Sequence, residues 1–253
     1  MSNISTIGIL GGMGPEATNR LCALITAHTP VGKDQDHVPV ITFNNSLIPD
    51  RVSAAYGGGE SPVPEMLRTA RVLEEAGADF LLMPCNLAHL FLEEVQAGVQ
   101  IKILDMIEET VGHIARHYPQ SREAGILAST PTLESGLYHR SFQKHGKRLV
   151  SPGAEEQAGS VMKAIYGSEG IKCGYKDGPR SLLTGAAERL VAAGAEMIIA
   201  GCTEVSLVLS SDNSPFTVID PLEIIARVAV ARARRTGDDD GETARAVRDG
   251  EPT

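Results

Sequence analysis

The sequence predicts an α/β protein built from two similar halves, each a parallel β-sheet flanked by helices, with a ligand site in the cleft between the halves. Three observations support this fold class: short aliphatic segments alternate with helical patterns, several motifs recur at one spacing, and only 4% of the 253 residues are aromatic. The core must therefore consist of Ile, Leu, Val and Ala. Such a core is typical of parallel sheets buried on both faces and unlike that of aromatic-rich β-sandwiches.

The elements follow from short aliphatic runs that end at Gly or Pro and from the longer amphipathic segments between them. The predicted strands are residues 7–10, 38–44, 80–83, 101–104, 124–128, 197–200 and 217–219. The predicted helices are residues 16–29, 64–76, 105–117, 155–165, 182–193 and 222–235.

An internal repeat indicates that the two halves are homologous. Three features recur at one offset of 117 residues: Gly8-Ile9-Leu10 with Gly125-Ile126-Leu127, Gly77-Ala78-Asp79 with Gly194-Ala195-Glu196, and Cys85 with Cys202. We expect a first domain of residues 1–107 plus 215–235, completed by the last helix, and a second domain of residues 108–214. The chain crossings near residues 105–120 and 212–220 would form a hinge that lets the cleft close.

The charge balance argues against anionic macromolecules as partners, because these bind to positively charged protein surfaces. The chain has 23 Lys and Arg against 32 Asp and Glu, a net charge of −9, and no basic cluster. Nucleic acids and anionic membrane surfaces are therefore not expected as partners. Residues 236–253 hold six acids and two arginines, and we expect them to form a disordered acidic tail.

Neither a membrane span nor a signal peptide is expected. No stretch approaches 18 consecutive apolar residues, and the first residues lack the positive charge that begins a secretory signal. We therefore expect a cytoplasmic protein, in which thiols stay reduced. The sequence leaves open whether the chain forms a homodimer.

Two of the four cysteines stand out by their positions. Cys85 and Cys202 each follow a predicted strand, and parallel sheets bind ligands at the carboxyl ends of their strands. Asn86 and Thr203, the residues that follow them, are both N-cap types, so we expect each thiol to lie at a helix N-terminus that lowers its pKa. Cys22 and Cys173 have no counterparts in the repeat.

Two thiols on opposite sides of one cleft suit the inversion of a carbon centre. One thiolate removes a proton from the carbon, and the other thiol delivers a proton to the opposite face, with no cofactor. The negative charge that develops needs nearby donors. Arg51, after the second predicted strand, could bind a carboxylate through two hydrogen bonds.

Several motifs resemble the cofactor-independent aspartate/glutamate racemase family, in particular its aspartate racemase branch. The resemblance runs from about residue 5 to residue 235. The motifs that carry it are Gly11-Gly12-Met13-Gly14-Pro15-Glu16-Ala17-Thr18, Asn44-Asn45 with Ile48-Pro49-Asp50-Arg51, Met83-Pro84-Cys85-Asn86-Leu87-Ala88-His89, and Gly201-Cys202-Thr203-Glu204.

This resemblance implies a PLP-independent amino-acid racemase or epimerase with no cofactor and no metal. Cys85 and Cys202 would be the two acid/base thiols, Arg51 the clamp for the substrate's side-chain carboxylate, and Lys172 a second cationic contact. The other expected substrate contacts are Met13, Asn86, Leu87, Thr132 and Thr203.

Two further residues are expected to support the site. His89, one helical turn after Cys85, either braces the turn or tunes the thiolate. Glu204 either binds neighbouring backbone or orients the substrate's amino group.

The chain departs from the family pattern at three places. Leu87 stands where the family usually has Thr, Asp220-Pro221-Leu222 replaces a hydroxyl-bearing motif, and Pro131 replaces a Gly. The substrate of this chain could therefore be an amino acid other than aspartate, with a larger or less polar group next to Leu87.

Three alternatives remain open. Gly12-Met13-Gly14-Pro15-Glu16-Ala17 fits the G-x-G-x-x-A pattern of nicotinamide-dependent dehydrogenases, although no acid ends the second predicted strand. Cys85, His89 and Cys202 could instead bind a metal in a hydrolase. The chain could also bind an amino acid without turning it over.

Overall fold

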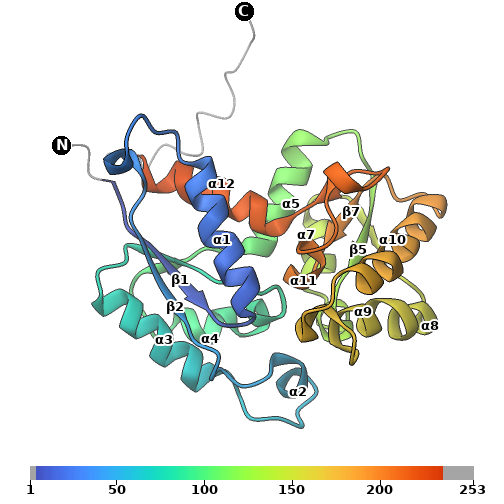
Figure 1. The fold of residues 1–253 in the computed structure, drawn as a ribbon, viewed down its shortest axis with the longest axis horizontal. Coiled ribbons are helices and arrows are strands. Elements are labelled where there is room, and N and C mark those ends of the chain that lie inside the picture. Colours follow the sequence, from blue (N-terminus) through green and yellow to red (C-terminus); the bar gives the residue numbers. More distant parts are fainter. Residues whose placement is uncertain (1–3, 236–253) are drawn as a thin grey trace, which may run out of the picture.

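Two four-stranded parallel sheets form the centre of the structure, a computed structural model that describes residues 4–235. The strand order is β2-β1-β3-β4 in the first sheet and β6-β5-β7-β8 in the second, so the two sheets share one topology. They lie in two halves placed side by side (Figure 1). The predicted fold class is confirmed. The acidic tail expected at residues 236–253 lies outside the described residues.

The elements alternate along the chain as a parallel sheet requires. The first half contains β1 (Ile7–Gly11), α1 (Pro15–His28), β2 (Val40–Asn44), α2 (Arg51–Ala55), α3 (Val63–Glu75), β3 (Phe80–Leu82), α4 (Leu92–Gln96) and β4 (Lys102–Ile103). The rest of the described chain contains α5 (Met106–His117), β5 (Glu123–Leu127), α6 (Thr130–Glu134), α7 (Leu137–Lys144), β6 (Arg148–Val150), α8 (Ala154–Glu156), α9 (Lys163–Tyr166), α10 (Asp177–Ala192), β7 (Ile198–Ala200), α11 (Thr203–Ser206), β8 (Val218–Ile219) and α12 (Pro221–Ala233).

All seven predicted strands are present, whereas strand β6 and the helices α2, α4, α6 and α7 were not predicted. β6 has only three residues, none of them buried, so it lacks the aliphatic run that identifies a strand. α7 is mostly polar and buries only Tyr138, Ser141 and Phe142. The helix predicted at residues 155–165 is interrupted by a π-helical segment, Gln157–Met162.

The offset of 117 residues is preserved in the register of the strands. Gly8 pairs with Leu81 in the first sheet, and Gly125 pairs with Ile198 in the second. A Cβ atom on Gly8 would lie 2.4 Å from the Leu81 side chain, and one on Gly125 would lie 2.7 Å from Ile198. The repeated glycines therefore make room for the side chains of the neighbouring strand.

The repeated Gly-Ala-acid motif ends a helix and starts a strand in each half. Gly77 and Gly194 have φ angles of +93° and +112°, and the residue after each donates back into the helix, as in a Schellman motif. The acid that follows then binds the backbone before the first strand of its sheet: Asp79 accepts from Thr6 N–H at 2.6 Å, and Glu196 accepts from Arg122 N–H at 2.7 Å.

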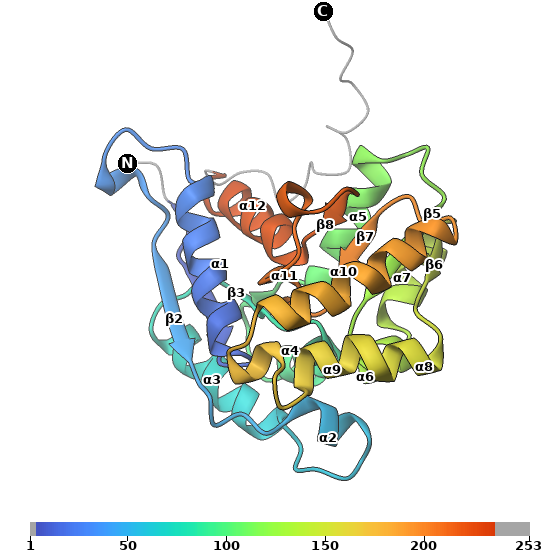
Figure 2. The ribbon, with the colours of Figure 1, turned by 45° about the vertical axis from the view of Figure 1, so that its right-hand side comes forward.

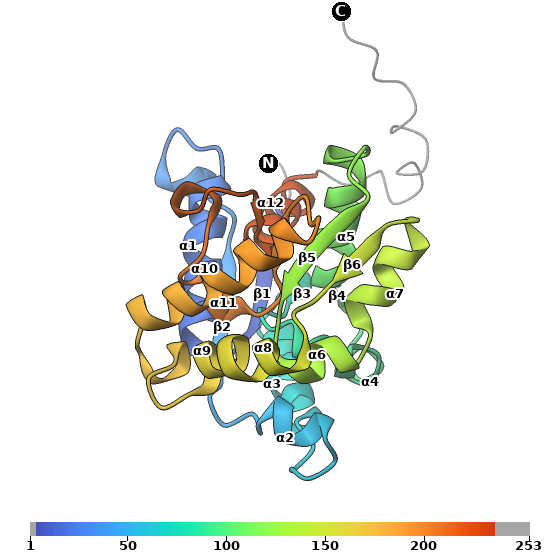
Figure 3. The same ribbon diagram turned by 90° about the vertical axis from the view of Figure 1, so that its right-hand side faces the viewer.

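Helices cover both faces of each sheet. In the first half, α1 and α12 pack on one face and α3 and α4 on the other, and α12 lies against α1 (Figure 2). In the second half, α5 and α7 cover one face of β5 and β7, and α9 and α10 cover the opposite face (Figure 3). The cores are almost entirely aliphatic, as the composition predicted.

The halves are joined through α5 and α12. Met106 at the start of α5 packs in the core of the first half, and Ile107 packs in that of the second. α12 likewise adds Leu222 to the first core and Ile224 to the second. The domain boundaries at residues 107/108 and 214/215 stay predictions, and both crossings carry apolar contacts to each side.

No helix within residues 4–235 is long and apolar enough to cross a membrane.

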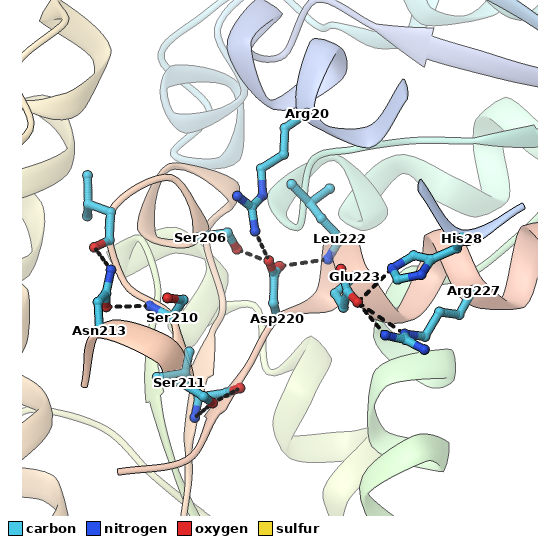
Figure 4. Close-up of polar contacts among 12 residues, drawn as sticks. Arg20, His28, Ser206, Ser210, Ser211, Asn213, Asp220, Leu222, Glu223 and Arg227 are labelled. Atoms are coloured by element: carbon cyan, nitrogen blue, oxygen red, sulfur yellow. Dashed lines mark hydrogen bonds and ion pairs between the residues drawn. The ribbon is translucent and has the colours of Figure 1, made fainter. Parts of the chain in front are cut away.

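Asp220 ties the second crossing to both halves (Figure 4). Its carboxylate caps α12 by accepting from Leu222 N–H at 2.9 Å, and it also accepts from Ser206 Oγ of α11 at 2.7 Å and from Arg20 of α1 at 2.8 Å. Three donors therefore converge on one carboxylate whose side chain is 13% exposed.

We expect Asp220→Ala to lower the free energy of unfolding by about 2–4 kcal/mol, because the helix cap and two further hydrogen bonds are lost together. Urea denaturation monitored by circular dichroism measures the change. Glu223→Ala is the matched control in the same helix, since Glu223 pairs with His28 and Arg227 at the more exposed surface, and it should cost less than about 1 kcal/mol. Equal costs for both variants would contradict the role assigned to Asp220.

Candidate active site

The two symmetry-related cysteines lie just past the carboxyl ends of the central strands. Cys85 follows β3, and its N–H donates to Met83 O at 2.8 Å; Cys202 follows β7, where Gly201 N–H donates to Ile199 O at 2.9 Å. Cys85 is buried and Cys202 is partly buried. Both turns thus end a central strand and begin a short helical segment, as the sequence predicted.

The predicted lowering of the thiol pKa is wrong for Cys202. The helix after Cys202 has only four residues, and Cys202 itself, rather than Thr203, is its N-cap. Burial raises the pKa of the Cys202 thiol well above its usual value, and the Glu204 carboxylate adds to this effect. A single helical turn supplies too little positive potential to offset a buried neighbouring charge.

Cys202, Glu204 and Lys172 form a continuous chain of polar contacts. Cys202 Sγ donates to Glu204 Oε2 at 2.9 Å, and Lys172 Nζ donates to Glu204 Oε1. Burial would raise the pKa of Glu204, but Lys172 and the hydrogen bond from Cys202 lower it. In this arrangement Glu204 is ionised and Cys202 is a thiol.

Lys172 and Tyr166 are both influenced by the Cys85 and Cys202 thiols. Burial would lower the pKa of Lys172, but the charges of Glu204, Cys202 and Cys85 raise it. Tyr166 behaves similarly: burial raises its pKa, and Cys202, Glu204 and Cys85 raise it further. Cys85 and Cys202, which come from different sheets, therefore both raise the pKa of Lys172 and of Tyr166.

Tyr166 is a residue of the site that the sequence did not suggest. The Lys172 ammonium lies 5.4 Å from the centre of its ring. Tyr166 ends α9, one residue beyond the predicted helix, and no motif marks it. Tyr166 is remote from both cysteines along the chain, so no local pattern predicts that it belongs to the same site.

A cavity of about 310 Å³ opens beside this cluster. Arg51, Lys172 and Glu204 line it together with the glycine-rich loop between β1 and α1. A Cβ atom on Gly14 would lie 3.4 Å from Glu204 Oε1, so this loop of the first half fits closely against the second half. Neither cysteine is on the wall of this cavity, but Cys202 adjoins it through its hydrogen bond to Glu204.

Arg51 reaches this cavity with part of its guanidinium already engaged. Nη1 donates to the carbonyls of Ile48 and Pro49 at 3.1 and 2.9 Å, and Nη2 donates to Met13 O at 3.3 Å. Nε has no partner among the described residues. The edge of the guanidinium that carries Nε therefore keeps a donor for a carboxylate.

His89 braces the turn after Cys85 and does not contact its thiol. Its Nε2 accepts from Met106 N–H at 3.1 Å, which leaves Nδ1 to donate to Cys85 O at 2.9 Å. Burial lowers the pKa of His89, so the ring is neutral. Both ring nitrogens are used by backbone groups, and this argues against the metal-hydrolase interpretation, as does the lack of any group of three His, Cys, Asp or Glu side chains suited to a metal within residues 4–235.

The other predicted contacts are buried, and most of them lie beside a thiol or Glu204. Leu87 and Met13 pack with Cys85 in one apolar cluster. Thr203 Oγ1 donates to Glu204 Oε2 at 3.3 Å, and Thr132 Oγ1 is 2.9 Å from Ser129 Oγ. Pro131 lies in the first turn of α6, a position in which proline is well tolerated.

Comparison with known proteins decides the family. A family model described as Asp/Glu/Hydantoin racemase matches residues 10–229. The chain belongs to this family. The resemblance read from the motifs and the predicted enzyme class, an isomerase, are thereby confirmed. The dehydrogenase interpretation of the glycine-rich loop loses its support.

Two relatives match the chain over most of its length. The broad specificity amino-acid racemase RacX of Bacillus subtilis is 26% identical over 231 residues, which cover 89% of this chain and 96% of the relative. The solved structure of Picrophilus torridus aspartate racemase has a TM-score of 0.78 and 26% identity, covering 92% of this chain and 96% of the other.

A more distant structure shares the fold alone. Glutamate racemase from Francisella tularensis, solved in complex with D-glutamate, has a TM-score of 0.60 at 15% identity and covers 94% of this chain and 86% of the other. The two-sheet architecture is thus common to racemases of different named substrates.

We expect Glu204 and Lys172 to move the pKa of Cys202 in opposite directions. Glu204→Gln removes a negative charge that disfavours the thiolate, so the pKa should fall, whereas Lys172→Met removes a positive charge, so it should rise. The pH dependence of Cys202 alkylation, measured with the other three cysteines replaced by serine, reports both shifts. Shifts of the same sign would contradict the charge arrangement described above.

Proposed function

We propose that this racemase inverts the α-carbon of aspartate, glutamate or a related amino acid without a cofactor, using Cys85 and Cys202 as its acid/base pair. One observation carries the proposal: two cysteines follow equivalent strands of two similar sheets, and each adjoins the same cavity through a neighbour. Cys202 is bonded to Glu204, which lines the cavity, and Cys85 packs with Met13, whose carbonyl accepts from the cavity residue Arg51. The names of the relatives support it, because one is an aspartate racemase and another a broad specificity amino-acid racemase.

The proposed step moves one proton to the enzyme and one to the substrate. The Cys85 thiolate takes the α-proton, and the bonding electron pair stays on the α-carbon and delocalises into the carboxylate. Cys202, held as a thiol by Glu204, then delivers its proton to the opposite face. The enzyme is left with Cys85 as thiol and Cys202 as thiolate, ready for the other enantiomer.

The positive charge at the site suits the carbanion that this step creates. Arg51 and Lys172 face the cavity, and the Glu204 charge is matched by Lys172. The negative charge that develops on the substrate therefore meets the remaining cation in a largely buried site, where charge interactions are strong. A small movement of the halves about α5 and α12 would admit the substrate from this cavity to the thiols, which do not line it.

A second candidate function is the binding of an amino acid without turnover. Leu87, 5% exposed and packed beside Cys85, supplies no hydroxyl where the family usually has one. Incorporation of solvent deuterium at the α-carbon, tested across D- and L-amino acids, separates the two functions. Binding detected by calorimetry without any exchange would favour the binder.

We expect Cys85→Ala and Cys202→Ala each to lower racemisation of both enantiomers by about 100-fold or more, because each direction uses both thiols. Chiral chromatography of reactions started from each enantiomer measures the loss. Cys22→Ala and Cys173→Ala are the matched controls and should retain activity. Full activity of either Cys85→Ala or Cys202→Ala in both directions would rule out the two-thiol mechanism.

We expect Arg51→Gln to discriminate between substrates. Its kcat/KM for aspartate or glutamate should fall about 10- to 100-fold more than its kcat/KM for an uncharged amino acid, because a charge-assisted contact to the side-chain carboxylate is lost. The uncharged substrate controls for any loosening of the loop that Arg51 holds. Equal losses for both substrates would show that Arg51 only supports the loop.

A further inference from the structure

A buried hydrogen bond connects the two halves directly behind the first thiol. Tyr138, on α7 of the second half, donates its hydroxyl to Asn86 Oδ1 at 2.6 Å. Asn86 follows Cys85 in the first half, and the two side chains are 1% and 2% exposed, respectively. It links α7 of the second half to the residue that follows the Cys85 thiol.

This hydrogen bond fixes the orientation of the Asn86 amide. Oδ1 faces the hydroxyl, so Nδ2 must point the other way. Nδ2 is buried and has no hydrogen-bond partner within the described part of the chain. A buried amide donor without an acceptor is unfavourable, and it becomes favourable when an acceptor is bound next to Cys85.

Tyr138 is well suited to remain a donor. Burial strongly raises its pKa, and the nearby carboxylates Asp105 and Asp220 add to this effect. Its ring packs in the core of the second half with Ile107 and Phe142, which holds the hydroxyl in place. The orientation of Asn86 is thus set by a rigid element across the cleft.

We propose that Tyr138 is a positioning residue, which turns the Asn86 amide so that Nδ2 donates to a carboxylate of the bound amino acid beside Cys85. This inference rests on the proposed function for the nature of the acceptor. Because the bond joins the two halves, Asn86 is oriented only when the halves are together. Substrate capture beside Cys85 is therefore coupled to closure of the cleft.

Tyr138→Phe tests this role, because it removes the hydroxyl and keeps the ring. We expect kcat/KM to fall about 10- to 100-fold, mainly through a higher KM, since a hydrogen bond to a charged group loses its orientation. Tyr118→Phe is the matched control at the end of α5. A Tyr138→Phe enzyme with unchanged kcat/KM would overturn the proposal.

A double-mutant cycle separates positioning from general damage. In an Asn86→Ala background the additional effect of Tyr138→Phe on kcat/KM should vanish, whereas a purely structural role would give the same loss in both backgrounds and contradict the proposal. Should Tyr138→Phe fail to fold, the Asn86→Asp variant tests whether the Nδ2 donor is needed. It keeps the acceptor for Tyr138 but replaces the Nδ2 donor, so kcat/KM should fall at least as far, and unchanged kcat/KM would overturn the proposal.

The unaltered protein distinguishes the two levels of failure. If it neither binds nor exchanges any amino acid, the proposed function fails. If it racemises and Tyr138→Phe is unaffected, only the positioning role fails.

Discussion

The buried carboxylate of Glu204 constrains the rest of the site. A carboxylate at 6% side-chain exposure is tolerated only when cations and donors surround it, and here Lys172, Cys202 and Thr203 provide them. The facing loop of the first half comes within van der Waals reach of this carboxylate, because a Cβ atom on Gly14 would lie 3.4 Å from Glu204 Oε1. The charge pairing of the second half therefore lies against the glycine-rich loop of the first half, and both line one cavity.

The fold is symmetric, but the surroundings of the two thiols are not. The repeat places Cys85 and Cys202 at equivalent strand ends because the register of each sheet is preserved. Beside Cys202 lies a carboxylate that holds it as a thiol, whereas beside Cys85 lie a neutral His89 and an amide. Duplication thus explains the geometry of a two-sided site, and later divergence explains why the two sides differ chemically.

The sequence was sufficient to predict the fold class and to mark several residues of the candidate site, for physical reasons. The Gly-Ala-acid motifs report a helix end and a strand start, so their recurrence revealed the duplicated sheets. Local motifs likewise marked Cys85, Cys202 and Glu204. Tyr138 and Tyr166 were missed because each reaches the site from a helix remote in sequence. The raised pKa of Cys202 was missed because it depends on burial, which a local N-cap pattern does not report.

The difference between the thiols has a consequence for a racemase that works in both directions. Removing a proton from Cys202 places a thiolate beside the Glu204 carboxylate, with Lys172 as the cation shared by both. The protonated form of Cys202 is therefore favoured when no substrate is bound. Under the proposed mechanism, this form accepts the enantiomer whose α-proton faces Cys85. The opposite enantiomer needs Cys202 as the thiolate, which is the disfavoured form. The two directions share one equilibrium constant, but because they start from different enzyme forms they need not share kcat or KM.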